Sequence, residues 1–429
     1  MSNPLIREKI CDGVHFSSVT DSKFKHNRIT VNLVTPLDKK TVTANAVVPF
    51  LLRKGCRSCP DFTRLNRRLC ELYGASLSCD VAKYGGNQVL ELSIYGVDRR
   101  FTFDNMDVTS QCAQLLAEIL FEPNLRDGFF PEEDVKLERQ QVVDAIESLM
   151  NEKRAYALSR CRQTMCKGER VAIEKYGDIE EAKALTPEKA TKAYQALLET
   201  AQIEIIFTGC GDPSAAKEVF SKAFAGKHRQ PILPAVQSYG IMPEGRNGVQ
   251  EAEDQMDVAQ GKLVLGMRAG EIKDKKALMA TRLMTAIYGG TPSSRLFTYV
   301  REKLSLCYYC AARFDRLTGL MFVDSGVEIA NRQTAQEEIL HQLSLLQAGE
   351  FSKEEEQAAL LLMQNSLRSV TDSLGAIGDW YMTQILYGSC DTPAQESEML
   401  GQVTREEIIE AARRTVLDTV YFLTAKEGN

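Results

Sequence analysis

The segment LCYYCAARFDRLTGLMFVDSGV, residues 306–327, has a counterpart near the start of the chain. Residues 77–97, LSCDVAKYGGNQVLELSIYGV, share its two β-rich runs and its glycine-containing turn. This pattern is typical of a β-hairpin. The two segments begin 229 residues apart, and a recurrence of this kind indicates an internal duplication.

A second pair of segments supports the duplication. Residues 185–209, LTPEKATKAYQALLETAQIEIIFTG, resemble residues 403–428, VTREEIIEAARRTVLDTVYFLTAKEG, at an offset of 218 residues. Each predicts a helix followed by a strand. The helix start signals are Thr186 before Pro187, and Thr404 in a capping box with Glu407.

The remaining patterns predict the fold class. Long helical periodicities over residues 132–164 and 353–387 alternate with short β-rich runs such as RITVNLV (28–34) and GKLVLGM (261–267). Hairpins imply antiparallel sheets. We therefore predict an α+β protein with two tandem duplicated domains, each an antiparallel sheet with helices packed on one face.

A linker divides the two halves. Residues 226–248 hold three prolines and four glycines, a composition typical of a connection between domains. A chain of 429 residues also suits two domains better than one. The predicted boundaries are an N-terminal domain over 1–230, a linker over 231–250 and a C-terminal domain over 251–429.

Composition limits the function classes. With 44% hydrophobic and 26% charged residues and a net charge of −6, the chain is ordinarily globular and lacks the basic footprint of a nucleic-acid-binding protein. Charges interrupt every apolar run of the first 16 residues, and no stretch is apolar enough for a membrane helix. We expect a cytoplasmic chain without membrane insertion, with its twelve cysteines reduced.

Two cysteine pairs have C-x-x-C spacing, Cys56/Cys59 and Cys307/Cys310. About 250 residues separate them, which disfavours a shared zinc ribbon. Neither pair opens a helix after a strand, which disfavours a thioredoxin-like redox motif. We therefore predict neither a metal site nor a redox role from spacing alone.

Histidine content restricts metal chemistry further. The chain has four histidines, His15, His26, His228 and His341, and no two of them are four residues apart. A helical H-x-x-E-H or H-E-x-x-H zinc site is therefore excluded. The chain also lacks a G-x-S-x-G elbow, a Walker A loop and a Rossmann glycine fingerprint.

Arg301 and Tyr308 are the candidate site residues. Arg301 falls in the last turn of a predicted helix, and Tyr308 begins the following strand. A structural interpretation is available for both, because an Arg there neutralises the helix dipole and a Tyr commonly packs at a strand start. The functional interpretation is that a guanidinium and a phenol together stabilise the developing oxyanion of a peptide carbonyl.

The segment SSRLFTYVREKLSLCY, residues 293–308, resembles the C-terminal half of the pitrilysin/insulinase family of zinc peptidases, which includes mitochondrial processing peptidase. Residues 256–268, MDVAQGKLVLGMR, and 185–198, LTPEKATKAYQALL, match that family as well. In the family, an Arg and a Tyr seven residues apart reach the zinc site. The resemblance implies that role for Arg301 and Tyr308.

The chain departs from the family at the zinc ligands. Counting back from Gly55 places Ala46, Pro49 and Phe50 where the His, Glu and His of the H-x-x-E-H motif should stand. The third ligand falls near Ala145 if Glu138 marks the later helix. We therefore expect no metal and no cofactor in this chain.

The resemblance implies a non-metal subunit of a heteromeric metallopeptidase. A zinc-bearing paralogue would be its partner and hold the zinc, while this chain binds peptide substrate and supplies Arg301 and Tyr308 in trans. The alternative is a non-catalytic peptide-binding or scaffold protein. A homodimeric hydrolase that uses the cysteines is a third reading, for which no histidine partner is evident.

Overall fold

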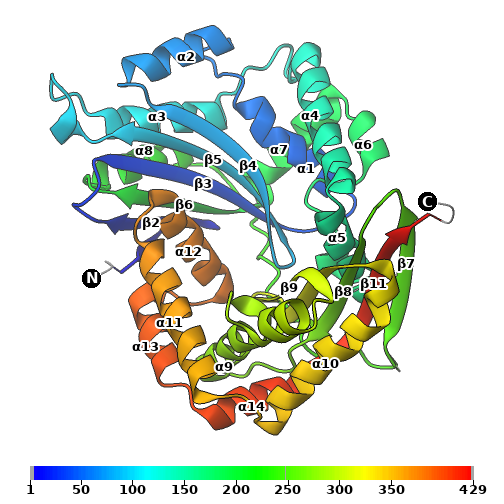
Figure 1. Cartoon of the computed structure of the whole chain (residues 1–429). Coiled ribbons are helices and arrows are strands. Elements are labelled where there is room, and N and C mark those ends of the chain that lie inside the picture. Colours follow the sequence, from blue (N-terminus) through cyan, green and yellow to red (C-terminus); the bar gives the residue numbers. More distant parts are fainter. Residues whose placement is uncertain (1–3, 247, 427–429) are drawn as a thin grey trace. The chain divides into compact units, whose positions relative to one another are not determined.

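The computed structural model describes residues 4–246 and 248–426 (Figure 1). These residues form two compact units. Unit 1 comprises Met1–Glu147, Ile173–Val236 and Val370–Thr392, and unit 2 comprises Ser148–Ala172, Gln237–Ser369 and Pro393–Asn429. Each unit contains one β-sheet with its own core.

Unit 1 is built on a six-stranded sheet with the order β1-β2-β6-β3-β5-β4. Its strands are β1 (Ile6–Cys11), β2 (Val14–Thr20), β3 (His26–Pro36), β4 (Ser76–Tyr84), β5 (Asn87–Val97) and β6 (Gln202–Gly209). Only β2 and β6 pair in parallel; the other neighbours are antiparallel.

Unit 2 repeats this arrangement in five strands, in the order β7-β11-β8-β10-β9. They are β7 (Gln250–Met256), β8 (Gly261–Arg268), β9 (Cys307–Asp315), β10 (Leu320–Val327) and β11 (Val416–Ala425). The parallel pair is again a single one, β7 with β11. Without β1, the two sheets match strand by strand, so the duplication and the α+β class are confirmed, with one parallel pair in each sheet.

The helices follow the predicted pattern. Those mainly in unit 1 are α1 (Val42–Leu52), α2 (Phe62–Glu71), α3 (Val108–Phe121), α4 (Glu132–Asn151), α6 (Ile179–Lys183), α7 (Pro187–Thr200), α8 (Ser214–Phe224) and α12 (Leu374–Tyr387). Those mainly in unit 2 are α5 (Lys153–Met165), α9 (Lys275–Thr285), α10 (Arg332–Ala348), α11 (Lys353–Val370), α13 (Pro393–Gly401) and α14 (Arg405–Arg414). Among the described residues, no helix is long and apolar enough to cross a membrane.

The helix caps behave as their sequences predict. Thr186 accepts a hydrogen bond from the backbone N–H of Lys189, and Thr404 forms a complete capping box with Glu407. The two long helical periodicities each divide into two helices, α4 with α5 and α11 with α12. The described residues also contain two π-helical segments, discussed below, and three short 3₁₀ turns: η1 (Arg99–Phe101), η2 (Arg170–Ala172) and η5 (Ile329–Asn331).

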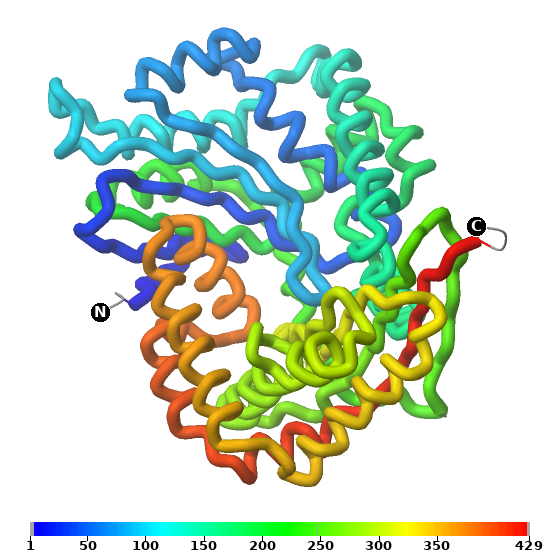
Figure 2. The backbone as a smooth tube through the Cα atoms, in the orientation of Figure 1, coloured from blue at the N-terminus to red at the C-terminus, as the bar shows by residue number. Residues whose placement is uncertain are grey.

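Each unit contains a helix from the other half of the sequence. Helix α5 packs on β8 and β11, with Cys161 and Met165 in the core of unit 2. The absence of a side chain at Gly266 permits this approach, because a Cβ there would lie 2.8 Å from the sulfur of Met165. Helix α12, in the orange part of the chain, packs on β6 and β3 of unit 1 (Figure 2). The compact units are therefore discontinuous, and the boundaries at residues 230 and 251 stay a prediction.

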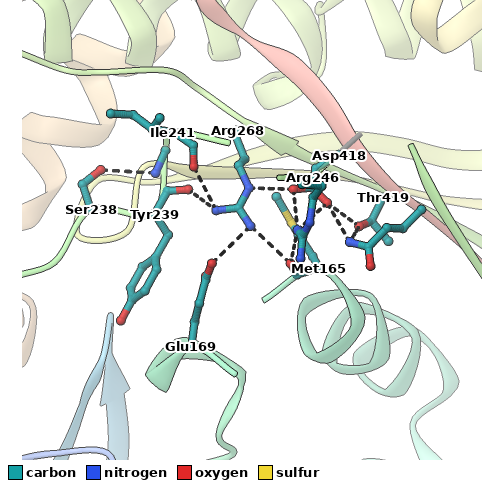
Figure 3. A network of polar contacts seen from close by, with 11 residues as sticks. Met165, Glu169, Ser238, Tyr239, Ile241, Arg246, Arg268, Asp418 and Thr419 are labelled. Atoms are coloured by element: carbon teal, nitrogen blue, oxygen red, sulfur yellow. Dashed lines mark hydrogen bonds and ion pairs between the residues drawn. The ribbon is translucent and has the colours of Figure 1, made fainter. Parts of the chain in front are cut away.

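A buried ion network holds unit 2 together (Figure 3). Arg268, 1% exposed, donates hydrogen bonds to Asp418 at 2.6 Å, to the Tyr239 carbonyl at 2.6 Å and to the Met165 carbonyl at 3.2 Å. Burial alone would raise the pKa of Asp418, but hydrogen bonds, that from Arg268 foremost, hold it below its usual value. The network joins β8 and β11 to the end of α5 and to the linker.

Candidate active-site remnant

The segment before β9 is a π-helix rather than the α-helix that the sequence predicts. Residues Leu296–Lys303 (η4) follow an earlier π-helical segment, Ala286–Gly290 (η3). At the end of η4, the N–H of Leu304 donates to the Tyr299 carbonyl at 3.1 Å, five residues back. Wide turns of this type are rare and recur at functional sites.

The connection from η4 to β9 is short and strained. Ser305 adopts a left-handed backbone with φ of 51°, which disfavours any residue with a Cβ. The N–H of Leu306 then donates to the Val300 carbonyl at 3.0 Å, which closes the turn. Strain of this kind persists only where the surrounding structure enforces it.

Tyr308 is the extra residue of a β-bulge. Tyr309 lies opposite Gly326 in the β9–β10 ladder, whereas the next residue of β10, Val327, lies opposite Cys307. Two residues of β9, Cys307 and Tyr308, therefore face one residue of β10. The Tyr308 side chain is 65% exposed as a result. Bulges reorient single side chains beside active sites in this way.

Arg301 and Tyr308 line the same surface pocket, of about 460 Å³. The rest of the lining is Glu302, Ser305, Leu306, Cys307 and Glu328. The Arg301 guanidinium lies 4.6 Å from the centre of the Phe297 ring. Within the described ranges, neither Arg301 nor Tyr308 has a hydrogen bond or ion pair through its side chain. Both polar groups are therefore available to a ligand.

The neighbouring Arg295, in contrast, has a guanidinium that is engaged in hydrogen bonds within the protein. Its side chain is buried, donates to both carboxylate oxygens of Glu355 at 3.1 Å and donates to Gln342 at 2.9 Å. Arg295 therefore has a structural role. The sequence segment contains both arginines, and only the structure separates the paired one from the unpaired one.

Helix α1 of unit 1 contains the three positions that the family resemblance assigns to zinc ligands, and none of them has metal-binding chemistry. Ala46 is 0% exposed within the main core, Pro49 is buried inside the helix, and Phe50 packs against the same core. None of these side chains offers an oxygen, nitrogen or sulfur ligand, so these three positions do not fit a zinc ion. In the part of the chain that the structure describes, no three His, Cys, Asp or Glu residues are grouped to hold a metal.

A buried ion pair lies beside this helix. Glu138 on α4 is 1% exposed, and the ammonium of Lys54, two residues beyond the end of α1, lies 3.0 Å from its carboxylate. Lys54 also lies 3.9 Å from Asp134, and burial raises the pKa of Asp134. Ala145 is half-buried further along α4. The charge that compensates Glu138 is thus a lysine of this chain.

The sequence identified Arg301 and Tyr308 as candidate site residues, but it did not predict the irregular backbone conformation around them. The π-helix, the left-handed Ser305 and the bulge have no compositional signal, since glycine, the usual marker of such features, is absent from residues 291–318. Gly289 and Gly290 lie in η3, where a Cβ on Gly289 would approach Ala312 of β9 to within 2.7 Å. Cys307 was not expected in the pocket.

Comparisons with known proteins show which sequences the chain resembles. A family model described as the peptidase M16 inactive domain matches residues 184–361. A Bacillus subtilis (strain 168) protein named "probable inactive metalloprotease YmfF" is 29% identical over 411 residues, which cover 96% of this chain and 95% of that protein. An uncharacterized zinc protease of Rickettsia bellii is 26% identical over 166 residues, or 37% of this chain and 39% of its own.

Solved structures share the whole fold. A conserved protein of Enterococcus faecalis V583 superposes with a TM-score of 0.90 at 25% identity, over 100% of both chains. The peptidase M16 inactive domain of Pseudomonas fluorescens gives a TM-score of 0.77 at 14% identity, over 98% of both chains. In sequence and fold, the chain is therefore similar to the pitrilysin/insulinase (M16) peptidases, and its sequence lacks the zinc-binding H-x-x-E-H motif.

Proposed function

We propose that this insulinase-family homologue is the non-metal subunit of a heteromeric zinc metallopeptidase of the cytoplasm. It binds peptide substrate and supplies Arg301 and Tyr308 to the zinc site of a zinc-bearing paralogue. One observation carries the proposal: two side chains that the family resemblance singles out share one pocket, and their polar groups are unpaired within the described residues.

The chemistry of the two groups suits acyl transfer. A guanidinium is charged at every physiological pH, and a phenol donates one hydrogen bond. Placed together, they can hydrogen-bond a substrate carbonyl and stabilise the negative charge that develops on its oxygen. The irregular backbone supports this role, because η4 and the bulge present both side chains without an internal partner.

The composition of α1 supports a partner that brings the metal. Ala46, Pro49 and Phe50 fill core space and cannot bind zinc, so peptide hydrolysis through zinc requires a second chain. The sheet of unit 2 also ends at β9, whose outer edge lacks a strand neighbour among the described residues. An extended peptide can add to such an edge through main-chain hydrogen bonds.

The test is a reconstituted pair of this chain and a zinc-bearing paralogue, assayed on an unfolded peptide. We expect Arg301→Ala and Tyr308→Phe each to lower kcat by about 10²-fold or more, as loss of one oxyanion donor does. Arg313→Ala is the matched control, because Arg313 is an exposed arginine of β9 outside the pocket lining. Complex formation, followed by size-exclusion chromatography, should be the same for all variants.

The scaffold alternative predicts a different result. If the chain only holds peptides or supports an assembly, Arg301→Ala and Tyr308→Phe leave kcat of the pair within about twofold of the wild type. Equal effects of Arg301→Ala and Arg313→Ala would also contradict the proposal, because they would show a general effect of surface charge.

A further inference from the structure

The bulge in β9 brings two cysteines to one face of the strand. Cys307 lies opposite Val327, and Cys310 lies opposite Ser325. Ser325 and Val327 are two residues apart in β10, so they point to the same face of the sheet. Without Tyr308 as the extra residue, cysteines three positions apart would point to opposite faces. The bulge therefore makes Cys307 and Cys310 neighbours on one face of β9.

The two thiols differ in access and in acidity. Both cysteines are buried, but Cys307, 8% exposed, lines the pocket of Arg301 and Tyr308, whereas Cys310, 4% exposed, does not. The neighbouring Cys310 thiol, followed by smaller contributions from Ser325 and Arg301, lowers the pKa of Cys307 to about 7. Burial raises the pKa of Cys310 well above its usual value. The pair thus combines a nucleophilic thiol at the pocket with a second thiol beside it.

We propose that Cys307 and Cys310 form a reversible dithiol–disulfide site that small disulfides such as glutathione disulfide oxidise. The spacing alone argued against a redox role, because the pair does not open a helix in a thioredoxin-like unit. In this protein the bulge, rather than the start of a helix, brings Cys307 close to Cys310. Both residues belong to the strand that presents Tyr308, and Cys307 places the site at the wall of the proposed substrate pocket.

The reaction proceeds by two exchanges. The Cys307 thiolate attacks one sulfur of the small disulfide, forms a mixed disulfide and releases one thiolate. Cys310 then gives up its proton and attacks the Cys307 sulfur, which expels the second small thiolate. Two protein thiols are oxidised to one disulfide, and one small disulfide is reduced to two thiols.

Oxidation changes the pocket in two ways. The disulfide closes a ring across Tyr308 and Tyr309, which restrains the backbone of the bulge. It also removes the thiolate that faces the Arg301 guanidinium. If the proposed function holds, on which this consequence rests, the redox state of the pair regulates the peptidase through the position of Tyr308 and the free charge of Arg301.

Cys56 and Cys59 provide an internal control with the same spacing. Their backbones form a tight turn, with the Cys56 N–H donating to the Cys59 carbonyl at 2.9 Å and the reverse bond at 3.0 Å. Both are buried, and burial raises the pKa of Cys56. This pair therefore has the spacing without the activated thiol, and we expect it to stay reduced.

The test equilibrates the full chain at pH 7 in mixtures of glutathione and glutathione disulfide, followed by acid quenching, alkylation and peptide mapping. We expect a Cys307–Cys310 disulfide in the wild type, a mixed disulfide on Cys307 in Cys310→Ser, and none on Cys310 in Cys307→Ser. Absence of the Cys307–Cys310 disulfide at every glutathione ratio, or earlier oxidation of Cys56 and Cys59, would overturn the proposal.

Two further readouts separate this inference from the proposed function. Hydrogen exchange over residues 304–310 should slow on oxidation of the wild type and remain unchanged in Cys307→Ser. Activity of the reconstituted pair should change at least threefold between the two redox states in the wild type only. A disulfide without a change in exchange or activity contradicts the regulatory role. A pair that is inactive in both states contradicts the proposed function and leaves the mapping result to decide the redox site.

Discussion

Helix α1 of unit 1 and the η4–β9 segment of unit 2 both belong to the stretch that leads from a central strand, β3 or β8, to the hairpin at the sheet edge, where α1 directly follows β3 and η4 directly precedes β9. The two regions differ in the burial and the polarity of the side chains at the positions that the family resemblance singles out. In α1, the three family ligand positions hold Ala46, Pro49 and Phe50, which complete a core. In η4–β9, Arg301 and Tyr308 stand exposed or half-exposed on an irregular backbone.

The two regions differ in the kind of interaction that determines their structure. Apolar packing and a lysine–glutamate pair stabilise the fold at α1, and they leave no ligand for a metal. A π-helix, a left-handed serine and a bulge cost stability, yet they persist beside the Arg and Tyr. We infer that the second region is maintained for function and the first for packing.

The largest effect on stability is expected when His, Glu and His replace the residues at the three ligand positions of α1. The triple variant Ala46→His/Pro49→Glu/Phe50→His forces polar and charged groups into a closed core. We expect a loss of at least about 3 kcal/mol in the free energy of unfolding, measured by urea denaturation. Zinc binding by the triple variant with retained stability would contradict the account of α1.

The ion pair beside α1 should show a smaller effect. Lys54→Met leaves the carboxylate of Glu138, 1% exposed, without its partner. We expect a loss of about 1–3 kcal/mol, partly recovered in Lys54→Met/Glu138→Gln. Arg57→Ala is the control, because the Arg57–Glu122 pair is exposed and should contribute less than about 1 kcal/mol. A loss that the second substitution does not reduce would show that Lys54 acts by packing alone.

Relief of strain at Ser305 should have an effect of opposite sign. A glycine accepts φ of 51° without the steric cost of a Cβ, although it loses more backbone entropy on folding. We therefore expect Ser305→Gly to raise the free energy of unfolding by up to about 1 kcal/mol. Thermal and urea unfolding would check it, and a destabilised variant would mean that the serine side chain makes a favourable contribution that outweighs the strain.

The smallest expected change is a shift in thiol reactivity. The pKa of Cys307, lowered to about 7, means that its thiolate fraction rises through neutral pH, so iodoacetamide labelling should be half-maximal near pH 7. Arg301→Gln should move this midpoint upward, and Cys310→Ala should move it further, since the Cys310 thiol is the larger cause and alanine offers no donor in its place. The carboxylates of Glu302 and Glu328 also line the pocket and oppose the effect of Arg301. Labelling of Cys307 that begins only above pH 9 would contradict the geometry.

The sequence predicted the duplicated α+β fold because two kinds of signal recur in it: hairpin patterns and capped helices. It also predicted the Arg301/Tyr308 pair through the family resemblance. It could not predict the exchange of α5 and α12 between the units, because a helix of either half has the same apolar periodicity whichever sheet it covers. The bulge escaped prediction because one added residue leaves the β-rich composition of residues 307–315 unchanged.

The central claim is best tested by measuring zinc content and peptidase activity of the purified chain, alone and mixed with a zinc-bearing paralogue. We predict no bound zinc and no activity for the chain alone, and activity in the mixture that Arg301→Ala or Tyr308→Phe removes. Stoichiometric zinc and peptidase activity in the chain alone would contradict the placement of Ala46, Pro49 and Phe50 at the ligand positions, and with it the account of a subunit that depends on its partner's metal.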